Sequence, residues 1–540
     1  MAQDWLMPYP NPGTYPFSGN FGARLQDTWA GYKARYITAH STGLVHDPSQ
    51  ADKPETADFD ETAWAVSEGQ GYGMLLALYH NDQACFDGIL DALYTRMYNK
   101  RGQGLFAWQV DSTGKTRSIA EGCTVDENGS ATDGDIFIGL ALAFADKMVQ
   151  SGHWSDTGKN YGTKAQSVIN NIYAYDIYSG RYVKGGNMWA DGYDRTNPSY
   201  FFTAAMKIFD SYESTQHDWT TVIDQCYTTI QSVNPGGSDG YFYGLNPDWC
   251  TRGGGISAGA NSGPSLNGYD HWYDAARVPW MMAVDAIWFN DPRAVTYCQN
   301  GTNFLKLTHG GESGAANNAI LYNMNGTPYG AAQGAYHNVM TVGMWGAGAV
   351  GSGDTNMQAA FTVEYNQYSV FTTSGYWGDW AGAGSIYYNQ SLGSFGALVM
   401  GGNFVNVYAD LGGVITTPTP TPEPTPIPTA VTPSDQLTKP DLPARSELTK
   451  NFPNPFTDGT SILYQLKVDE GLADVKIIIH SMDGRKLRTV DLGQQYSGKN
   501  KVATWDGMTD TGNKLKKGVY LYTLEVGGKR IGTKKMMKID

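Results

Sequence analysis

A proline-rich segment divides this chain, so the chain cannot fold around a single core. From Thr416 to Pro433 the sequence reads TTPTPTPEPTPIPTAVTP. Proline fixes φ and lacks a backbone N–H, so alternating prolines favour an extended polyproline II conformation. We therefore expect two folded domains, residues 1–415 and 446–540, joined by a linker over 416–445. The chain has 540 residues, which is more than usually fold around one hydrophobic core, and this agrees with the division.

The first domain is predicted to be all helical. Segments such as YGMLLALYH and ACFDGILDALYTRMY have apolar residues at helical spacing and are separated by short loops rich in Gly, Asn and Asp. About twelve such segments in consecutive pairs predict six helical hairpins, which would form an (α/α)6 barrel. The expected helices cover 21–37, 68–80, 84–98, 134–150, 162–175, 197–213, 217–232, 274–289, 293–307, 332–349, 356–371 and 388–400.

The second domain is predicted to be an all-β sandwich of immunoglobulin type. Its apolar runs are short, and turn residues such as Asp483-Gly484 and Asn513 separate them. From residue 451 onward there are 15 Lys and Arg against 10 Asp and Glu, a net charge of +5. Since the whole chain has a net charge of −14, the residues before 451 carry −19. The two domains therefore have net charges of opposite sign. The expected strands are SILYQLKV, ADVKIIIH, KLRTVDL, KVATWDG, GVYLYTLEV and KRIGTKKMMKI.

Three motifs place an acid among glycines, aromatic residues or an arginine. They are SEGQGYGM around Glu68, ATDGD around Asp133 and YDAARVPW around Asp274. Cleavage of a glycosidic bond needs acids for proton transfer and rings that contact sugar faces. Each acid alone also fits a structural role, because acids at a helix N-terminus cap the helix or interact with its dipole. Asp135 is expected to be structural.

Taken together and in this order, the motifs resemble glycoside hydrolase family 8, over roughly residues 20–410. That family includes endo-β-1,4-glucanases, xylanases, chitosanases and lichenases and has the (α/α)6 barrel fold. The resemblance implies that Glu68 is the general acid, Asp274 the general base and Asp133 the carboxylate that holds the distorted sugar. It also implies inversion, in which the protonated acid and the ionised base stand well apart.

Further cleft residues are expected around the three acids. Arg277 follows Asp274 by three residues, so on a helix it could pair with that carboxylate and keep it ionised; a structural salt bridge is the alternative. A glycine-rich stretch over 253–268 is expected to form a wall loop. Aromatic residues in positions that resemble the family's sugar contacts, each of which core packing would explain equally well, are Trp108, Trp189, Tyr200, Tyr273 and Tyr387.

The motif forms favour a glucanase over the other activities of the family. GQGYGM and ATDGD resemble the family's glucanases more than its xylanases, and the base in YDAARVPW argues against its chitosanases. We expect an inverting endo-β-1,4-glucanase of cellulase type, acting on cellulose or mixed-linkage β-glucan. The alternatives are a xylanase or chitosanase of the same family, a polysaccharide lyase, and a non-catalytic glycan-binding surface protein.

Composition excludes other classes of partner. With 38 Lys and Arg against 52 Asp and Glu there is no broad basic surface for nucleic acid, and no apolar run reaches the length of a membrane span. Five cysteines without CxxC spacing indicate neither a zinc site nor a disulfide framework; they are Cys85, Cys123, Cys226, Cys250 and Cys298. We expect no cofactor and no metal, a monomer, and a β-1,4-linked polysaccharide as the partner.

The second domain resembles the immunoglobulin-like module of the flagellar-hook capping protein and the sorting domains of type IX secretion. The resemblance rests on NFPNPF at 451–456, WDG at 505–507 and GVY at 518–520. It implies a secreted or cell-surface bacterial protein whose module contacts secretion machinery, with a carbohydrate-binding module as the alternative. The opening MAQDWLMPYPNPG lacks the apolar core of a signal peptide. The loop from Asp506 to Asp510 is expected to be a hairpin turn rather than a calcium site.

Overall fold

The computed structural model divides the chain into two compact units; of the described residues, those between 22 and 415 belong to the first and those between 445 and 539 to the second. Several predictions lie outside the described residues: the linker, the opening segment, most of the wall loop, Cys123 and Asp506. The domain boundaries at 415 and 446 therefore stay a prediction. The described residues are 22–38, 41–46, 64–121, 126–189, 194–233, 244–255, 270–324, 326, 328–329, 337–367, 387–415 and 445–539, the last with gaps at 453, 458, 468–472, 496–497 and 506.

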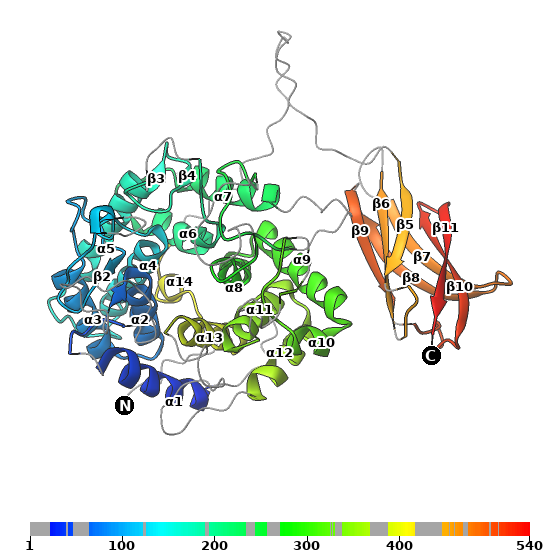
Figure 1. Cartoon of the computed structure of the whole chain (residues 1–540), viewed down its shortest axis with the longest axis horizontal. Helices are drawn as coiled ribbons and strands as arrows, with labels where there is room; N and C mark the ends of the chain where they lie inside the picture. Colours follow the sequence, from blue (N-terminus) through cyan, green and yellow to red (C-terminus); the bar gives the residue numbers. More distant parts are fainter. Residues whose placement is uncertain are drawn as a thin grey trace, which may run out of the picture. The chain divides into compact units, whose positions relative to one another are not determined.

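Six helices form an inner ring in the first unit (Figure 1). Each packs against the next in chain order, and the last packs against the first, which closes the ring. Most of these helices are buried along nearly their whole length, as expected for helices surrounded by other helices. The inner helices are α2 (Ser67–Tyr79), α4 (Thr132–Gln150), α6 (Thr203–Tyr212), α8 (Val278–Phe289), α11 (Val339–Ser352) and α13 (Tyr387–Met400).

Six further helices cover the ring from outside, each against an inner helix. The structure thus confirms the predicted (α/α)6 barrel. Two short helices, α10 (Glu312–Asn317) and α14 (Val407–Asp410), were not predicted. The outer helices are α1 (Gly22–Tyr32), which continues as a π-helical turn over Lys33–Thr38, α3 (Gln83–Arg96), α5 (Tyr161–Asn171), α7 (Trp219–Val233), α9 (Pro292–His309) and α12 (Thr355–Gln367).

The helix expected over 332–349 begins only at Val339, capped by Asn338. Two other inner helices also begin later than predicted, because turns precede them. The helix expected over 197–213 starts at Thr203, after a 3-10 turn over Pro198–Tyr200. The helix expected over 274–289 starts at Val278, after a 3-10 turn over Ala275–Arg277. Pro198 begins the first of these 3-10 turns and Pro279 lies in the first turn of α8, positions where the missing N–H of proline costs nothing. Asp274 thus precedes a 3-10 turn rather than beginning the α-helix.

Glycines bring the N-terminal ends of α2 and α4 into direct contact. A Cβ on Gly71 would lie 2.5 Å from the Cβ of Phe137. A Cβ on Gly134 would lie 2.8 Å from the backbone nitrogen of Glu68 and 2.9 Å from the carbonyl carbon of Ser67. Backbone atoms cannot rotate away as a flexible side chain can. The two glycines therefore set the spacing between the helices that carry Glu68 and Asp133.

The second unit is a sandwich of two antiparallel sheets with its own core, as predicted. One sheet has the order β5-β6-β9 and the other β11-β10-β7-β8. The six expected strands are all present, and a seventh, β5, was missed because ELTKNF has little apolar alternation. The predicted turn at Gly484 is present, with φ of 85°. The strands are β5 (Glu447–Phe452), β6 (Thr460–Leu466), β7 (Ala473–Ser481), β8 (Lys486–Gln495), β9 (Gly498–Trp505), β10 (Gly518–Val526) and β11 (Lys529–Lys538).

The contact between α2 and α4 yields a stability prediction. Gly134→Ala should lower the free energy of unfolding by about 1–3 kcal/mol, because the added methyl group overpacks against backbone. Gly88→Ala on the exposed side of α3 is the matched control, since nothing lies within 4 Å of its added Cβ. The control should raise stability by about 0.5–1 kcal/mol, the usual gain for Gly→Ala in a helix. Thermal unfolding of both variants measures the difference. If Gly134→Ala is as stable as Gly88→Ala, or more stable, the close-contact argument is refuted.

Candidate active site

The N-terminal ends of the inner helices converge on one cluster of acids. Glu68 lies in the first turn of α2 and Asp133 in the first turn of α4. Asp274 precedes the turn that leads into α8, and Tyr387 begins α13. Backbone N–H groups at a helix N-terminus carry partial positive charge, so this end of the barrel favours carboxylates.

Neither Glu68 nor Asp133 caps its helix. The N-cap residues are Val66 for α2 and Ala131 for α4, and neither helix has a side-chain cap. The N-cap position that the sequence left open is therefore wrong for both acids, although Asp133 Oδ1 accepts the N–H of Gly134 in the first turn of α4 at 2.9 Å. Glu68 Oε2 and Asp133 Oδ2 each accept a hydrogen bond from Arg277.

Arg277 holds the three acids together. Its guanidinium is 1% exposed, and Nη1 lies 2.6 Å from Glu68 Oε2 and 2.7 Å from Asp133 Oδ2. Nη2 lies 3.6 Å from Asp274 Oδ1. The predicted pairing with Asp274 is thus the longest of its three carboxylate contacts. One buried cation thus contacts acids that lie as far as about two hundred residues apart in the sequence.

Polar neighbours fix the orientation of the guanidinium. Nη2 donates to Ser199 Oγ at 2.6 Å, and Nη1 donates to the hydroxyl of Tyr72 at 3.1 Å. Ser199 in turn donates through Oγ and its backbone N–H to Asn197 Oδ1. With every part of the guanidinium plane held, Arg277 has a single position relative to the acids.

Glu68 is in an environment that keeps it protonated at neutral pH. Burial raises its pKa to about 8; the charge of Arg277 and a hydrogen bond from Tyr387 oppose this rise, and Asp133 and Asp274 add to it. The hydroxyl of Tyr387 donates to Glu68 Oε1 at 2.8 Å. A carboxyl group that holds its proton near pH 7 is suited to act as a general acid.

Asp274 is the most exposed of the three acids. Its side chain is 35% exposed, against 15% for Glu68 and 5% for Asp133. Burial shifts its pKa upward, while Arg277 and the Nδ2 of Asn197, which donates to Oδ2 at 2.8 Å, favour its ionised form. Solvent at the exposed face limits the effect of burial. A carboxylate with one side open to water is suited to act as a base.

The expected aromatic residues lie at different distances from the acids. Tyr387 contacts Glu68 directly, and the ring of Tyr200 lies 5.6 Å from the guanidinium carbon of Arg277. Tyr273 adjoins Asp274, and its carbonyl accepts a hydrogen bond from Tyr388.

Two predicted rings are one step further out. The carbonyl of Trp108 accepts the N–H of Ser67, beside Glu68. Trp189 stacks on Trp249 with ring centroids 4.8 Å apart, and Trp249 contacts Tyr200 edge on. The backbone of Trp108 thus adjoins the start of α2, and Trp189 is linked through Trp249 to Tyr200; a role of either ring in contacting sugar stays a prediction.

Sequence reasoning missed four residues of this site. Tyr72 lay inside a quoted motif, and Asn197 and Ser199 lay beside Tyr200, but nothing in their spacing indicated Arg277 as a partner. Asp248 gave no signal at all. Its Oδ1 accepts the N–H groups of Trp272 and Ala275 at 3.2 and 2.9 Å and so holds the turn that carries Asp274.

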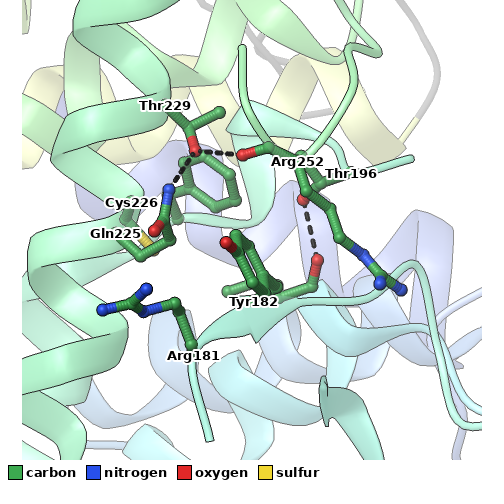
Figure 2. A pocket seen from close by; sticks show the side chains of 9 residues that line it. Arg181, Tyr182, Thr196, Gln225, Cys226, Thr229 and Arg252 are labelled. Carbon is green, nitrogen blue, oxygen red and sulfur yellow. Dashed lines mark hydrogen bonds between the residues drawn. The ribbon is translucent and has the colours of Figure 1, made fainter. Parts of the chain in front are cut away.

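A small hollow elsewhere in the barrel unit does not compete with this site. Figure 2 shows its lining, from β4 (Tyr182–Val183), α7 and the neighbouring loops, with Thr229 donating to the carbonyl of Arg252 and Thr196 to that of Val183. Two arginines and several neutral side chains line it, and none of the three acids does.

Within the described residues, no group of three His, Cys, Asp or Glu side chains could hold a metal ion. The four described cysteines are free thiols: Cys85, Cys226, Cys250 and Cys298. None of the described helices has the length and apolarity needed to cross a membrane.

Comparison with known proteins identifies the first unit. The family described as "Glycosyl hydrolases family 8" matches residues 16–402. The chain belongs to this family and is a glycoside hydrolase. The FlgD Ig-like domain matches residues 450–529, in the second unit.

The similar proteins are glucan hydrolases and a xylanase. Endoglucanase A of Acetivibrio thermocellus is 33% identical over 74% of this chain and 73% of its own length. Endoglucanase C of Ruminiclostridium cellulolyticum is 30% identical over 74% of this chain and 78% of its own. The β-1,3-1,4-glucanase of Paenibacillus sp. X4 superposes with a TM-score of 0.57 at 23% identity, covering 74% of this chain and 97% of that one, which shows a shared fold.

Arg277 yields the second prediction. Arg277→Met should lower the free energy of unfolding by about 3–5 kcal/mol, because it leaves buried carboxylates without their cation. Loss of the cation raises the pKa values of those carboxyls, so the deficit should grow as the pH rises from 5 to 8. Thermal unfolding at both pH values measures it.

Arg293→Met is the matched control. Arg293 also pairs with two carboxylates, Asp224 and Asp291, but it is 31% exposed. Solvent screens its ion pairs, so we expect a smaller loss. An equal loss in the two variants would contradict the special role of the buried guanidinium.

Proposed function

We propose that this glycoside hydrolase is an endo-β-1,4-glucanase that acts with inversion. Glu68 is the general acid, Asp274 the general base and Asp133 the carboxylate that holds the distorted sugar at the cleavage point. The observation that carries the proposal is the different environment of two acids around one guanidinium. Glu68 is enclosed and keeps its proton, whereas Asp274 is open to solvent and bound to a different nitrogen of Arg277.

The proposed reaction follows from these environments. Glu68 donates its proton to the leaving glycosidic oxygen while Asp274 removes a proton from a water molecule that attacks the opposite face of the sugar. As Glu68 becomes an anion, Arg277 and Tyr387 already lie at hydrogen-bonding distance to stabilise it. No new contacts need to form during the proton transfer.

Cellulose or mixed-linkage β-glucan is the proposed substrate. Endoglucanases are among the relatives that share most of their length with this chain, and the motif forms around Glu68 and Asp133 point the same way. A relative named as a xylose-releasing exo-oligoxylanase, Rex8A of Paenibacillus barcinonensis, is 26% identical over half of this chain, which keeps xylan as the second candidate.

For the second unit we propose a role in secretion or attachment to the bacterial cell surface. Its match to the FlgD Ig-like domain supports a protein-binding module. We further propose that the enzyme works as a monomer outside the cytoplasm, where a polymeric glucan is accessible.

The third prediction concerns stereochemistry and substrate together. Carboxymethyl cellulose and mixed-linkage β-glucan should be hydrolysed faster than xylan and chitosan, and the first product released from the β-linked polymer should be the α-anomer. Inversion needs room for water, so the carboxyl groups of Glu68 and Asp274 should lie about 6.5–9.5 Å apart. Proton NMR of the fresh product, before mutarotation, measures the anomer.

An initial β-anomer would exclude Asp274 as a base and favour a covalent intermediate. Faster cleavage of xylan would keep the mechanism and reject the glucanase assignment. A product with a new double bond would indicate a lyase, and no cleavage of any of the polymers would indicate a glycan-binding protein.

The fourth prediction tests the acid. Tyr387→Phe removes a hydrogen bond that lowers the pKa of Glu68, so that pKa should rise from about 8. Activity needs Glu68 protonated and is lost as the pH rises through this pKa. The alkaline limb of kcat/KM should therefore move to higher pH, by roughly half a unit to one unit, the size of one hydrogen bond.

Tyr388→Phe is the control for this shift. The hydroxyl of Tyr388 donates to the carbonyl of Tyr273 at 2.6 Å and not to Glu68. Its removal should leave the alkaline limb nearer its original position. If both variants shift equally, or Tyr387→Phe shifts the limb downward, the limb does not report Glu68.

A further inference from the structure

We propose that Asp135 and Asp176 share one proton and act together as positioning residues for the sugar-binding walls of the site. Asp135 lies in the first turn of α4, two residues after Asp133. Asp176 ends the π-helical turn over Ile172–Asp176 that follows α5. The inference deepens the proposed function, on which its activity readout rests.

The two carboxyl groups are fully buried and within hydrogen-bonding reach of each other. Asp135 Oδ1 accepts the N–H of Phe106 at 3.4 Å, and Asp176 Oδ1 accepts the hydroxyl of Ser130 at 2.9 Å. Among the described residues no other donor reaches the Oδ2 atom of either one. A hydrogen bond between the two carboxyl groups would satisfy these atoms, and it requires a proton.

Electrostatics favours the same arrangement. Two adjacent buried carboxyl groups cannot both ionise without a large cost. Burial raises the pKa of Asp135 well above its ordinary value, with the charge of Asp176 next in size, and it raises the pKa of Asp176 to about 7. The charged groups that face the pair are Asp133, which favours the protonated forms, and Lys184, which favours an ionised Asp176. The shared proton therefore belongs on Asp135.

The pair connects three segments that furnish the site. Ser130, which donates to Asp176, also exchanges two hydrogen bonds with Asn187, at 2.8 and 2.9 Å, two residues before Trp189. Phe106, which donates to Asp135, lies two residues before Trp108. These contacts link the start of α4, which carries Asp133, to the walls that carry both tryptophans. Neither acid contacts Arg277, so the pair acts through these segments.

Infrared spectroscopy tests the shared proton directly. The full-length Glu68→Gln protein removes the carboxyl band of Glu68, and in that background Asp135→Asn should abolish one band of a protonated carboxyl at pH 7. Asp111→Asn is the control, because Asp111 is also buried but its Oδ1 accepts the backbone N–H groups of Thr113 and Lys115. No difference between Glu68→Gln and Glu68→Gln/Asp135→Asn would overturn the proposal, whatever the enzyme's activity.

Kinetics on a soluble β-glucan test the positioning role with Glu68 intact. Asp135→Asn can still donate a hydrogen bond to Asp176 and should retain kcat/KM within about threefold. Asp135→Leu cannot, and kcat/KM should fall at least tenfold, with a rise in KM as the tryptophan walls move. Equal activity of the two variants, or an Asn variant as impaired as the Leu variant, would overturn the role. If the Leu variant does not fold, the infrared difference and the retained activity of the Asn variant decide.

Discussion

One buried guanidinium sets the geometry of this enzyme's site. Arg277 contacts Glu68, Asp133 and Asp274 at once, and removing a cation from such a group leaves carboxylates that the interior cannot solvate. The helices that carry the acids must therefore bring their N-terminal ends to the same point. The barrel supplies this arrangement, because each inner helix packs on its neighbours and the ring closes. The helix dipoles at that end reinforce the attraction for anions.

Close helix contact explains why the acids are embedded among glycines. At Gly134 the backbone of α4 meets the backbone of α2 beside Glu68, and at Gly69 the ring of Tyr387 would lie 3.1 Å from an added Cβ. Each glycine lets a catalytic candidate and its partner approach within hydrogen-bonding distance. The glycines of SEGQGYGM and ATDGD thus have a packing role that is separate from the chemistry of the acids. Motif recognition detects both roles without distinguishing them.

Much of the fold could be predicted from local patterns, whereas most contacts in the site could not. Helical periodicity located the twelve long helices, and alternation located six of seven strands. The strand β5 was missed because ELTKNF has little apolar alternation, and its pairing with β6 is a contact that a local pattern does not reveal. The three candidate acids could be singled out because their motifs are local, and the structure brings them together around Arg277. Of the partners of Arg277 only Asp274 was predicted, because Ser199, Tyr72 and Glu68 are distant in sequence and reach it only when the inner helices assemble. Asp248 could not be predicted for the same reason, since the turn that it stabilises begins 24 residues later, at Trp272.

The charge of the site depends on which buried carboxyl groups keep their protons. Arg277 lies against the carboxyl groups of Glu68, Asp133 and Asp274, so a proton held on Glu68 limits the negative charge that this one cation must balance. In the proposed reaction Glu68 gives up its proton while Asp274 takes one from water, so the negative charge moves to Glu68, where Arg277 and Tyr387 already lie at hydrogen-bonding distance. A further anion at Asp135, two residues from Asp133, would oppose that transfer. Burial beside Asp176 keeps Asp135 neutral. Desolvation therefore has two effects here: it raises the pKa of Glu68, and it limits the negative charge near Asp133.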